Sequence, residues 1–167
     1  MDIPKRKPNR LLNFDYGTPG FYFLTICVAG KQCLLANIVG GGALDAPQIQ
    51  LTEIGKVAEK YILSGSRIPH ICVDKYIIMP NHIHLLLAVN ETEKTGPSKA
   101  PAPTNAIIPR FVSTFKRFCH KDIGTKIFQR SYHDHIIRGE KDYLKIWQYI
   151  DNNPARWQED CFFVTDA

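Results

Sequence analysis

The order of the predicted elements places this chain of 167 residues in the α+β class. A strand, a helix, two strands, a helix, a strand and a last helix follow one another along the sequence. An antiparallel sheet with helices on one face accounts for this order, and it matches a ferredoxin-like βαββαβ core with one added C-terminal helix. The length suits one compact domain over residues 1–167.

The first half of the chain supplies a strand, a short strand and a helix. Residues 20–28 are rich in aromatic and β-branched side chains, which is typical of a central strand. Three glycines at 40–42 predict a turn, and residues 48–51 a short strand after it. Thr52 then has the character of an N-cap, and the apolar residues after it recur at helical spacing until about residue 64.

The second half repeats the pattern after a hairpin. Residues 70–79 and 81–89 read as strands, and the short break between them predicts antiparallel pairing. A polar, proline-rich stretch at about 90–104 is typical of a mobile linker. A basic amphipathic helix is predicted from Ala106, a strand over 127–137, and a helix over about 140–153 that Pro154 ends.

Composition sets limits on location and partners. The formal net charge of +5 is compatible with a polyanion partner, although many mildly basic proteins have none. For the basic arm at 1–19, a solvated tail is the simpler explanation. Five cysteines without a C-x-x-C pair predict neither a disulfide framework nor a zinc ribbon. Since no apolar stretch suits a signal peptide or a membrane span, we expect a cytoplasmic protein.

His82-Ile83-His84 is the most informative pattern in the sequence. In a strand, residues i and i+2 point to the same face, so the two imidazoles are expected side by side. A divalent metal is the natural user of such a pair, and Mn²⁺ suits two imidazoles better than Mg²⁺ does. Zinc would need a third strong ligand. The alternative is a pair of hydrogen-bonded strand histidines.

The last predicted helix carries a second candidate pair. Tyr149 and Asn153 are four residues apart and therefore share one helix face. A phenol and an amide oxygen on one face can act as a nucleophile and a metal ligand. A packing aromatic and a residue that ends the helix before Pro154 explain the same pattern.

Two further patterns compete with these. His133 and His135 repeat the H-x-H spacing, but polar residues surround them. A set of cations could form a phosphate-binding face, for which a solvated basic surface is the simpler explanation. That set consists of Arg110, Lys116, Arg117, Lys121, Arg130 and Arg138.

Four segments, in order, resemble one family. Residues 76–87 (Tyr-Ile-Ile-Met-Pro-Asn-His-Ile-His-Leu-Leu-Leu) resemble the metal-binding strand of single-tyrosine HUH transposases. Residues 142–154 resemble the catalytic helix of the branch known as REP-associated tyrosine transposases. Residues 128–138 are similar to the strand before that helix, and residues 10–25 to the start of the family. The resemblance covers nearly the whole chain outside the linker.

The resemblance implies roles for specific residues. His82 and His84 would be ligands of Mg²⁺ or Mn²⁺, Asn153 a third ligand, and Tyr149 the nucleophile. The implied activity is DNA transposition, a form of DNA recombination. In it, single-stranded DNA with imperfect hairpins is cleaved and rejoined through a 5′-phosphotyrosine and a free 3′-OH. Relatives act as monomers or as homodimers.

Two other functions fit the same residues. One is a hairpin-DNA-binding module that does not transpose, and the other is a metal-dependent phosphoesterase that uses water. In either enzymatic case the histidine ligands must be neutral, so we expect activity to fall as the pH drops through about 6.

Overall fold

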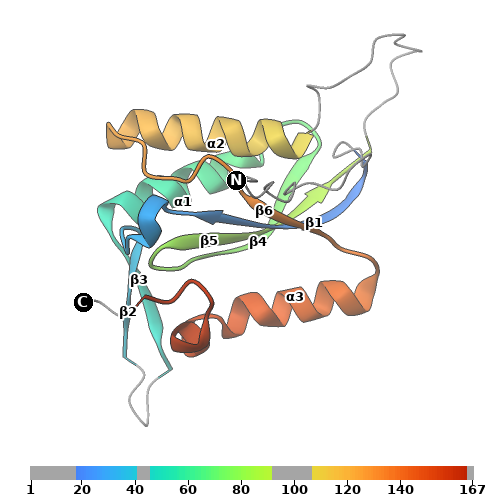
Figure 1. Ribbon diagram of the computed structural model, residues 1–167. Coiled ribbons are helices and arrows are strands. Elements are labelled where there is room, and N and C mark those ends of the chain that lie inside the picture. Colours follow the sequence, from blue (N-terminus) through green and yellow to red (C-terminus); the bar gives the residue numbers. More distant parts are fainter. Residues whose placement is uncertain (1–17, 41–45, 92–106, 165–167) are drawn as a thin grey trace, which may run out of the picture.

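One sheet separates two layers of helices (Figure 1). The computed structural model describes residues 18–40, 46–91 and 107–164. The elements are β1 (Gly20–Cys27), η1 (Ala29–Lys31), β2 (Ala36–Val39), β3 (Gln48–Leu51), α1 (Glu53–Gly65), β4 (Ile71–Ile78), β5 (His82–Val89), α2 (Ile107–Ile123), β6 (His133–Ile136), α3 (Glu140–Asn152) and η2 (Pro154–Glu159). No helix in these ranges is both long and apolar enough to cross a bilayer.

The main sheet has the strand order β4-β5-β1-β6, and each neighbouring pair is antiparallel. Helices α1 and α2 cover one face, and α3 lies on the other (Figure 1). This is the ferredoxin-like arrangement with an added C-terminal helix, so the predicted fold class is confirmed. A separate hairpin, β2 with β3, stands beside the sheet.

The alternation of side chains along β5 decides what each face contains. Ile83, Leu85 and Leu87 belong to the hydrophobic core that α1 and α2 cover. The intervening side chains therefore point to the face of α3. Since β5 is hydrogen-bonded to β1 on one side and β4 on the other, it is an interior strand of the sheet.

A bulge in β4 changes which face its side chains serve. The register shifts between Val73 and Lys75, and Val73 and Tyr76 both pack against the core. One extra residue reverses the alternation, so Lys75 reaches α3. Its Nζ lies 3.9 Å from the ring centroid of Trp147 and 2.6 Å from Asp151 Oδ1. The edge strand thereby anchors α3 to the sheet.

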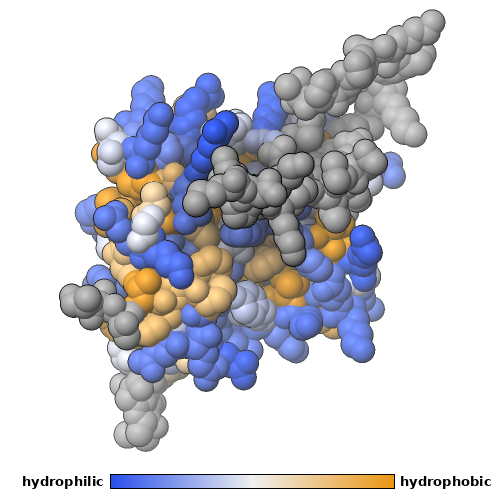
Figure 2. All heavy atoms as spheres, in the orientation of Figure 1, coloured by the Kyte–Doolittle hydropathy of each residue, from blue (hydrophilic) through white to orange (hydrophobic). Residues whose placement is uncertain are grey.

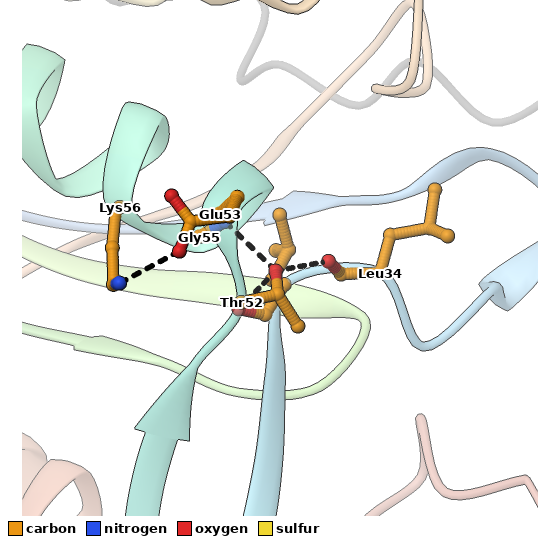
Figure 3. A network of polar contacts seen from close by, with 6 residues as sticks. Leu34, Thr52, Glu53, Gly55 and Lys56 are labelled. Atoms are coloured by element: carbon orange, nitrogen blue, oxygen red, sulfur yellow. Dashed lines mark hydrogen bonds and ion pairs between the residues drawn. The ribbon is translucent and has the colours of Figure 1, made fainter.

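Hydrogen bonds of the Thr52 side chain fix the start of helix α1 (Figure 3). The hydroxyl oxygen of Thr52 accepts a hydrogen bond from the Gly55 amide at 3.0 Å, and the hydroxyl donates to the Leu34 carbonyl at 2.6 Å. A Cβ on Gly55 would lie 2.0 Å from the Leu35 carbonyl oxygen. Only glycine fits this approach of the helix to the 34–35 backbone.

Some predicted features differ or fall outside the described ranges. The strand expected over 127–137 is shorter, since β6 spans only His133–Ile136. The backbone before β6 bonds elsewhere, because carbonyls of residues 129–131 accept from Lys116. Residues 1–17 of the predicted arm and residues 92–104 of the predicted linker lie outside the described residues. The five cysteines are free thiols.

Candidate active site

Two imidazoles meet on the α3 side of the sheet. His82 and His84 come from the interior strand β5, and their exposed fractions are 0% and 1%. Their Nε2 atoms lie 3.0 Å apart. The sequence prediction that the two rings lie side by side agrees with this geometry.

Neighbouring groups orient the first ring. The Asn81 side-chain amide donates to the backbone carbonyls of Lys31 at 3.1 Å and Phe162 at 2.8 Å. Its Oδ1 therefore faces Nδ1 of His82, at 3.0 Å. Because an amide oxygen only accepts, His82 carries its proton on Nδ1 and a lone pair on Nε2.

The second ring can adopt the same tautomer. Nδ1 of His84 lies 2.9 Å from the hydroxyl oxygen of Thr25, which can accept a hydrogen bond. The two Nε2 atoms then face each other with their lone pairs at 3.0 Å. These lone pairs repel each other unless a cation binds both. Adjacent ligand atoms of an octahedral ion with bonds of about 2.1 Å are separated by about 3 Å, so the pair fits such an ion.

Burial keeps the pair neutral. It lowers the pKa of His82 to about 4, although the charge of Asp160 acts in the opposite direction. The pKa of His84 lies well below its ordinary value, because of burial and then because of neighbouring His82. Neutral imidazoles are the form that binds metal, so the site needs no deprotonation at pH 7.

Tyr149 reaches the pair from α3. Its hydroxyl lies 3.3 Å from Nε2 of His84 and 3.4 Å from Oδ2 of Asp160, and the residue is 41% exposed. Burial, and after it the charge of Asp160, raise its pKa to about 12. The phenol is therefore neutral at pH 7 and needs a stabilising cation or a base to act as a nucleophile.

Asp160 is the member of this site that the sequence did not reveal. A ligand atom from each of His82, His84 and Asp160 lies within 4.8 Å of the other two. Asn153, which is 3% exposed, donates through Nδ2 to Asp160 Oδ2 at 3.1 Å. The Oδ1 atom of Asn153 is buried and has no hydrogen-bond partner in the described part of the chain. A buried acceptor without a partner, like the two facing Nε2 atoms, suits a site that holds a cation.

The other H-x-H pair has a different environment. Nε2 of His135 lies 2.8 Å from Asp142 Oδ2, which also accepts from the Arg138 amide at 3.1 Å. These contacts fix the first turn of α3 beside β6. His133 is exposed, and neither histidine belongs to the cluster around His82.

Cations lie in three different settings. A pocket of about 460 Å³ opens beside Tyr149, and Lys145 and Arg156 are among its lining residues. The exposed cations of the predicted phosphate-binding set lie on α2 or flank β6; they are Arg110, Arg117, Lys121, Arg130 and Arg138. Hydrophilic side chains line the upper edge of the molecule, over α2 (Figure 2).

Lys116 differs from the rest of that set. It is 9% exposed, and its Nζ donates to the backbone carbonyls of Gln129 at 2.7 Å and Ser131 at 2.9 Å. Burial lowers its pKa to about 8. Its ammonium group thus holds the segment before β6 and is not presented on the surface.

Comparison with known proteins agrees with this architecture. The chain matches no family model. It is similar to a solved structure of a REP-associated tyrosine transposase bound to a REP hairpin. The TM-score is 0.61 at 18% identity, over 91% of this chain and 74% of that one. The fold is therefore that of the REP-associated tyrosine transposases, as the resemblance implied.

A closer relative defines the family. An uncharacterized protein of Haemophilus influenzae is 33% identical in an alignment that covers 97% of this chain and 95% of that protein. The chain belongs to the family of this Haemophilus protein.

Proposed function

We propose that the protein is a metal-dependent single-stranded DNA transposase that cleaves and rejoins hairpin-bearing DNA through a 5′-phosphotyrosine on Tyr149. The observation that carries the proposal is the 3.3 Å distance between the Tyr149 hydroxyl and Nε2 of His84. A phenol beside two convergent, neutral imidazoles combines a nucleophile with a place for a cation.

The cation in this proposal is Mg²⁺ or Mn²⁺. His82 and His84 would bind it through Nε2, and the family resemblance implies Asn153, which is buried and hydrogen-bonded to Asp160, as a further ligand. A bound ion would supply positive charge that offsets the negative charge of a phosphodiester. Two imidazoles favour Mn²⁺ over Mg²⁺.

Tyr149 performs the covalent step. Its phenolic oxygen attacks the phosphorus, the bond from phosphorus to the 3′ oxygen breaks, and the phenolic proton is transferred, directly or through solvent, to the departing 3′ oxygen. The products are a 5′-phosphotyrosine and a free 3′-OH. The phosphotyrosine keeps the phosphoester linkage, so attack by a 3′-OH can reverse the step and join strands. Such reversibility suits strand transfer better than hydrolysis.

The surroundings support a single-stranded, anionic substrate. Tyr149 is 41% exposed and borders the pocket that Lys145 and Arg156 help to line. These cations can bind phosphates on either side of the scissile bond, which makes affinity dependent on salt. The hairpin requirement is our extension from the structural neighbour, whose structure contains a REP hairpin.

The decisive experiment compares two tyrosines of the same helix. Wild-type protein with Mn²⁺ and a labelled single-stranded hairpin should give a covalent protein–DNA adduct. Tyr149→Phe should give none. Tyr143→Phe is the matched control, because its hydroxyl donates to Asp74 and lies outside the histidine cluster.

Two results would refute the proposal. If Tyr149→Phe cleaves as well as wild type and no adduct forms, the protein is a phosphoesterase that uses water. If wild type and variant bind hairpins equally and neither cleaves, the protein is a DNA-binding module.

A further inference from the structure

We propose that the Asp160 carboxylate is a third protein ligand of the cation and that its coordination fixes the segment after α3 against the histidines. The inference rests on the metal site of the proposed function and names a ligand that the family resemblance did not supply. The cluster of His82, His84 and Asp160, with ligand atoms within 4.8 Å of one another, carries it.

The orientation of the carboxylate supports a ligand role. Its Oδ1 accepts a hydrogen bond from the Phe162 amide at 2.8 Å, which fixes one oxygen within the segment itself. Its Oδ2 faces the site, where it accepts from Asn153 Nδ2 at 3.1 Å and from the Tyr149 hydroxyl at 3.4 Å. Hydrogen bonds of this kind hold a ligand in place before the ion arrives.

Charge also favours Asp160. Neither the imidazoles nor the Asn153 amide can bring negative charge to a bound cation. Asp160 is the anion of the cluster, and hard divalent cations prefer carboxylate oxygen. Two histidines and one carboxylate form a recognised ligand set for divalent metals that leaves coordination positions open for solvent or substrate oxygens.

With Asp160 as a ligand of the cation, Asn153 has a different role from the one that the family resemblance implies. Its Nδ2 donates to Asp160 at 3.1 Å, so the amide positions the carboxylate. Asn153 is then a positioning residue, and the loss of its side chain should weaken metal binding less than the loss of the Asp160 carboxylate.

The residues after α3 make further contacts with the strand that holds the histidines. The Phe162 ring centroid lies 4.6 Å from that of His82, and the Trp157 centroid 5.8 Å from it. The Phe162 carbonyl accepts from Asn81 at 2.8 Å. A metal bond through Asp160 would add a direct link between these two parts, so metal should slow amide exchange over residues 154–164.

The test is Mn²⁺ binding by the full chain, measured by calorimetry and by electron paramagnetic resonance, with thermal melts to verify folding. Asp160→Asn, which keeps the shape of the side chain, should weaken binding at least tenfold. It should also change the visible spectrum of bound Co²⁺. Glu159→Gln is the matched control, an exposed acid of the same segment, and should stay within twofold of wild type.

Three outcomes would overturn the inference. One is wild-type affinity and an unchanged Co²⁺ spectrum in Asp160→Asn. Another is a larger loss in Asn153→Ala than in Asp160→Asn, which would make the amide the ligand. The third is tighter binding or faster cleavage in Asp160→Ala, which would mean that the carboxylate obstructs the site.

The adduct assay separates this inference from the proposed function. If Mn²⁺ binds through Asp160 and no tyrosine adduct forms, the function is wrong and the ligand assignment stands. If the adduct forms and Asp160→Asn binds Mn²⁺ like wild type, only the ligand assignment is wrong. If wild type binds no divalent cation, the ligand assignment is wrong regardless of the assay.

Discussion

The Tyr149 hydroxyl lies 3.3 Å from Nε2 of His84, although 65 positions separate the two residues in the chain. Phe23 of β1 contacts both, since its ring stacks on His84 at 5.0 Å and meets the Tyr149 ring edge-on at 5.9 Å. The distance between the Tyr149 hydroxyl and His84 therefore depends on how α3 packs on the sheet.

Asn81→Ala should weaken Mn²⁺ binding 10- to 100-fold, because His82 loses the acceptor that fixes its tautomer and ring orientation. Calorimetry with the folded variant measures the effect. Asn37→Ala, at an exposed position on β2, is the control and should bind like wild type. Unchanged affinity in Asn81→Ala would show that the amide does not orient the ligand.

Stability should fall as the pH drops from about 6.5 toward 4. The folded-state pKa of His82 is about 4, so in this window the unfolded chain takes up a proton that the folded protein does not. The contribution of neutral His82 is complete above pH 6.5, and its loss amounts to about 3 kcal/mol at pH 4. Urea titrations at pH 7, 6, 5 and 4.5 measure this slope.

The lowered pKa of His82 also changes the pH range in which metal binding is expected. An ordinary pair of histidine ligands would become protonated near pH 6 and release the metal, whereas burial should extend Mn²⁺ binding toward lower pH.

His82→Gln is the control for the urea titrations, and its curve of stability against pH should be flatter than that of wild type. A wild-type curve as flat as that of His82→Gln would contradict the depressed pKa.

Gly55→Ala should destabilise the fold by about 1–3 kcal/mol, because the new Cβ meets a backbone carbonyl that cannot rotate away. Chemical denaturation measures the change. Lys56→Ala, in the same helical turn, removes only an ion pair in which both side chains are more than half exposed, and should cost at most about 1 kcal/mol. Equal effects of the two substitutions would show that the backbone at residues 34–35 moves to accommodate the new Cβ.

Two adjacent cations of α2 should behave in opposite ways. Lys116→Met should lower stability, since buried carbonyls lose their donor, and should leave the salt dependence of DNA binding unchanged. Arg117→Gln should leave stability unchanged and, if α2 contacts phosphates, reduce the slope of log affinity against log salt by about one. Denaturation and fluorescence-anisotropy titrations at several salt concentrations separate the two effects.

Local periodicity explains what could be predicted from the sequence. A period of two predicts that His82 and His84 share a face, and a spacing of four does the same for Tyr149 and Asn153. The two pairs meet because α3 lies on the face of the sheet opposite α1 and α2 (Figure 1). Asp160 has no such signal, since it follows a 3-10 turn and reaches the site through an irregular segment. The burial of Lys116 was equally hidden, because its acceptors are carbonyls more than ten residues away.

The position of β5 inside the sheet divides the site into a fixed half and an adjustable half. The histidines belong to a strand that is bonded along both edges, and their side chains have almost no exposed surface. Tyr149 and Asp160 belong to a helix and a short segment on one open side. In the proposed function, that outer half would therefore have to accommodate the DNA, and the two imidazoles would give the scissile phosphate a fixed position.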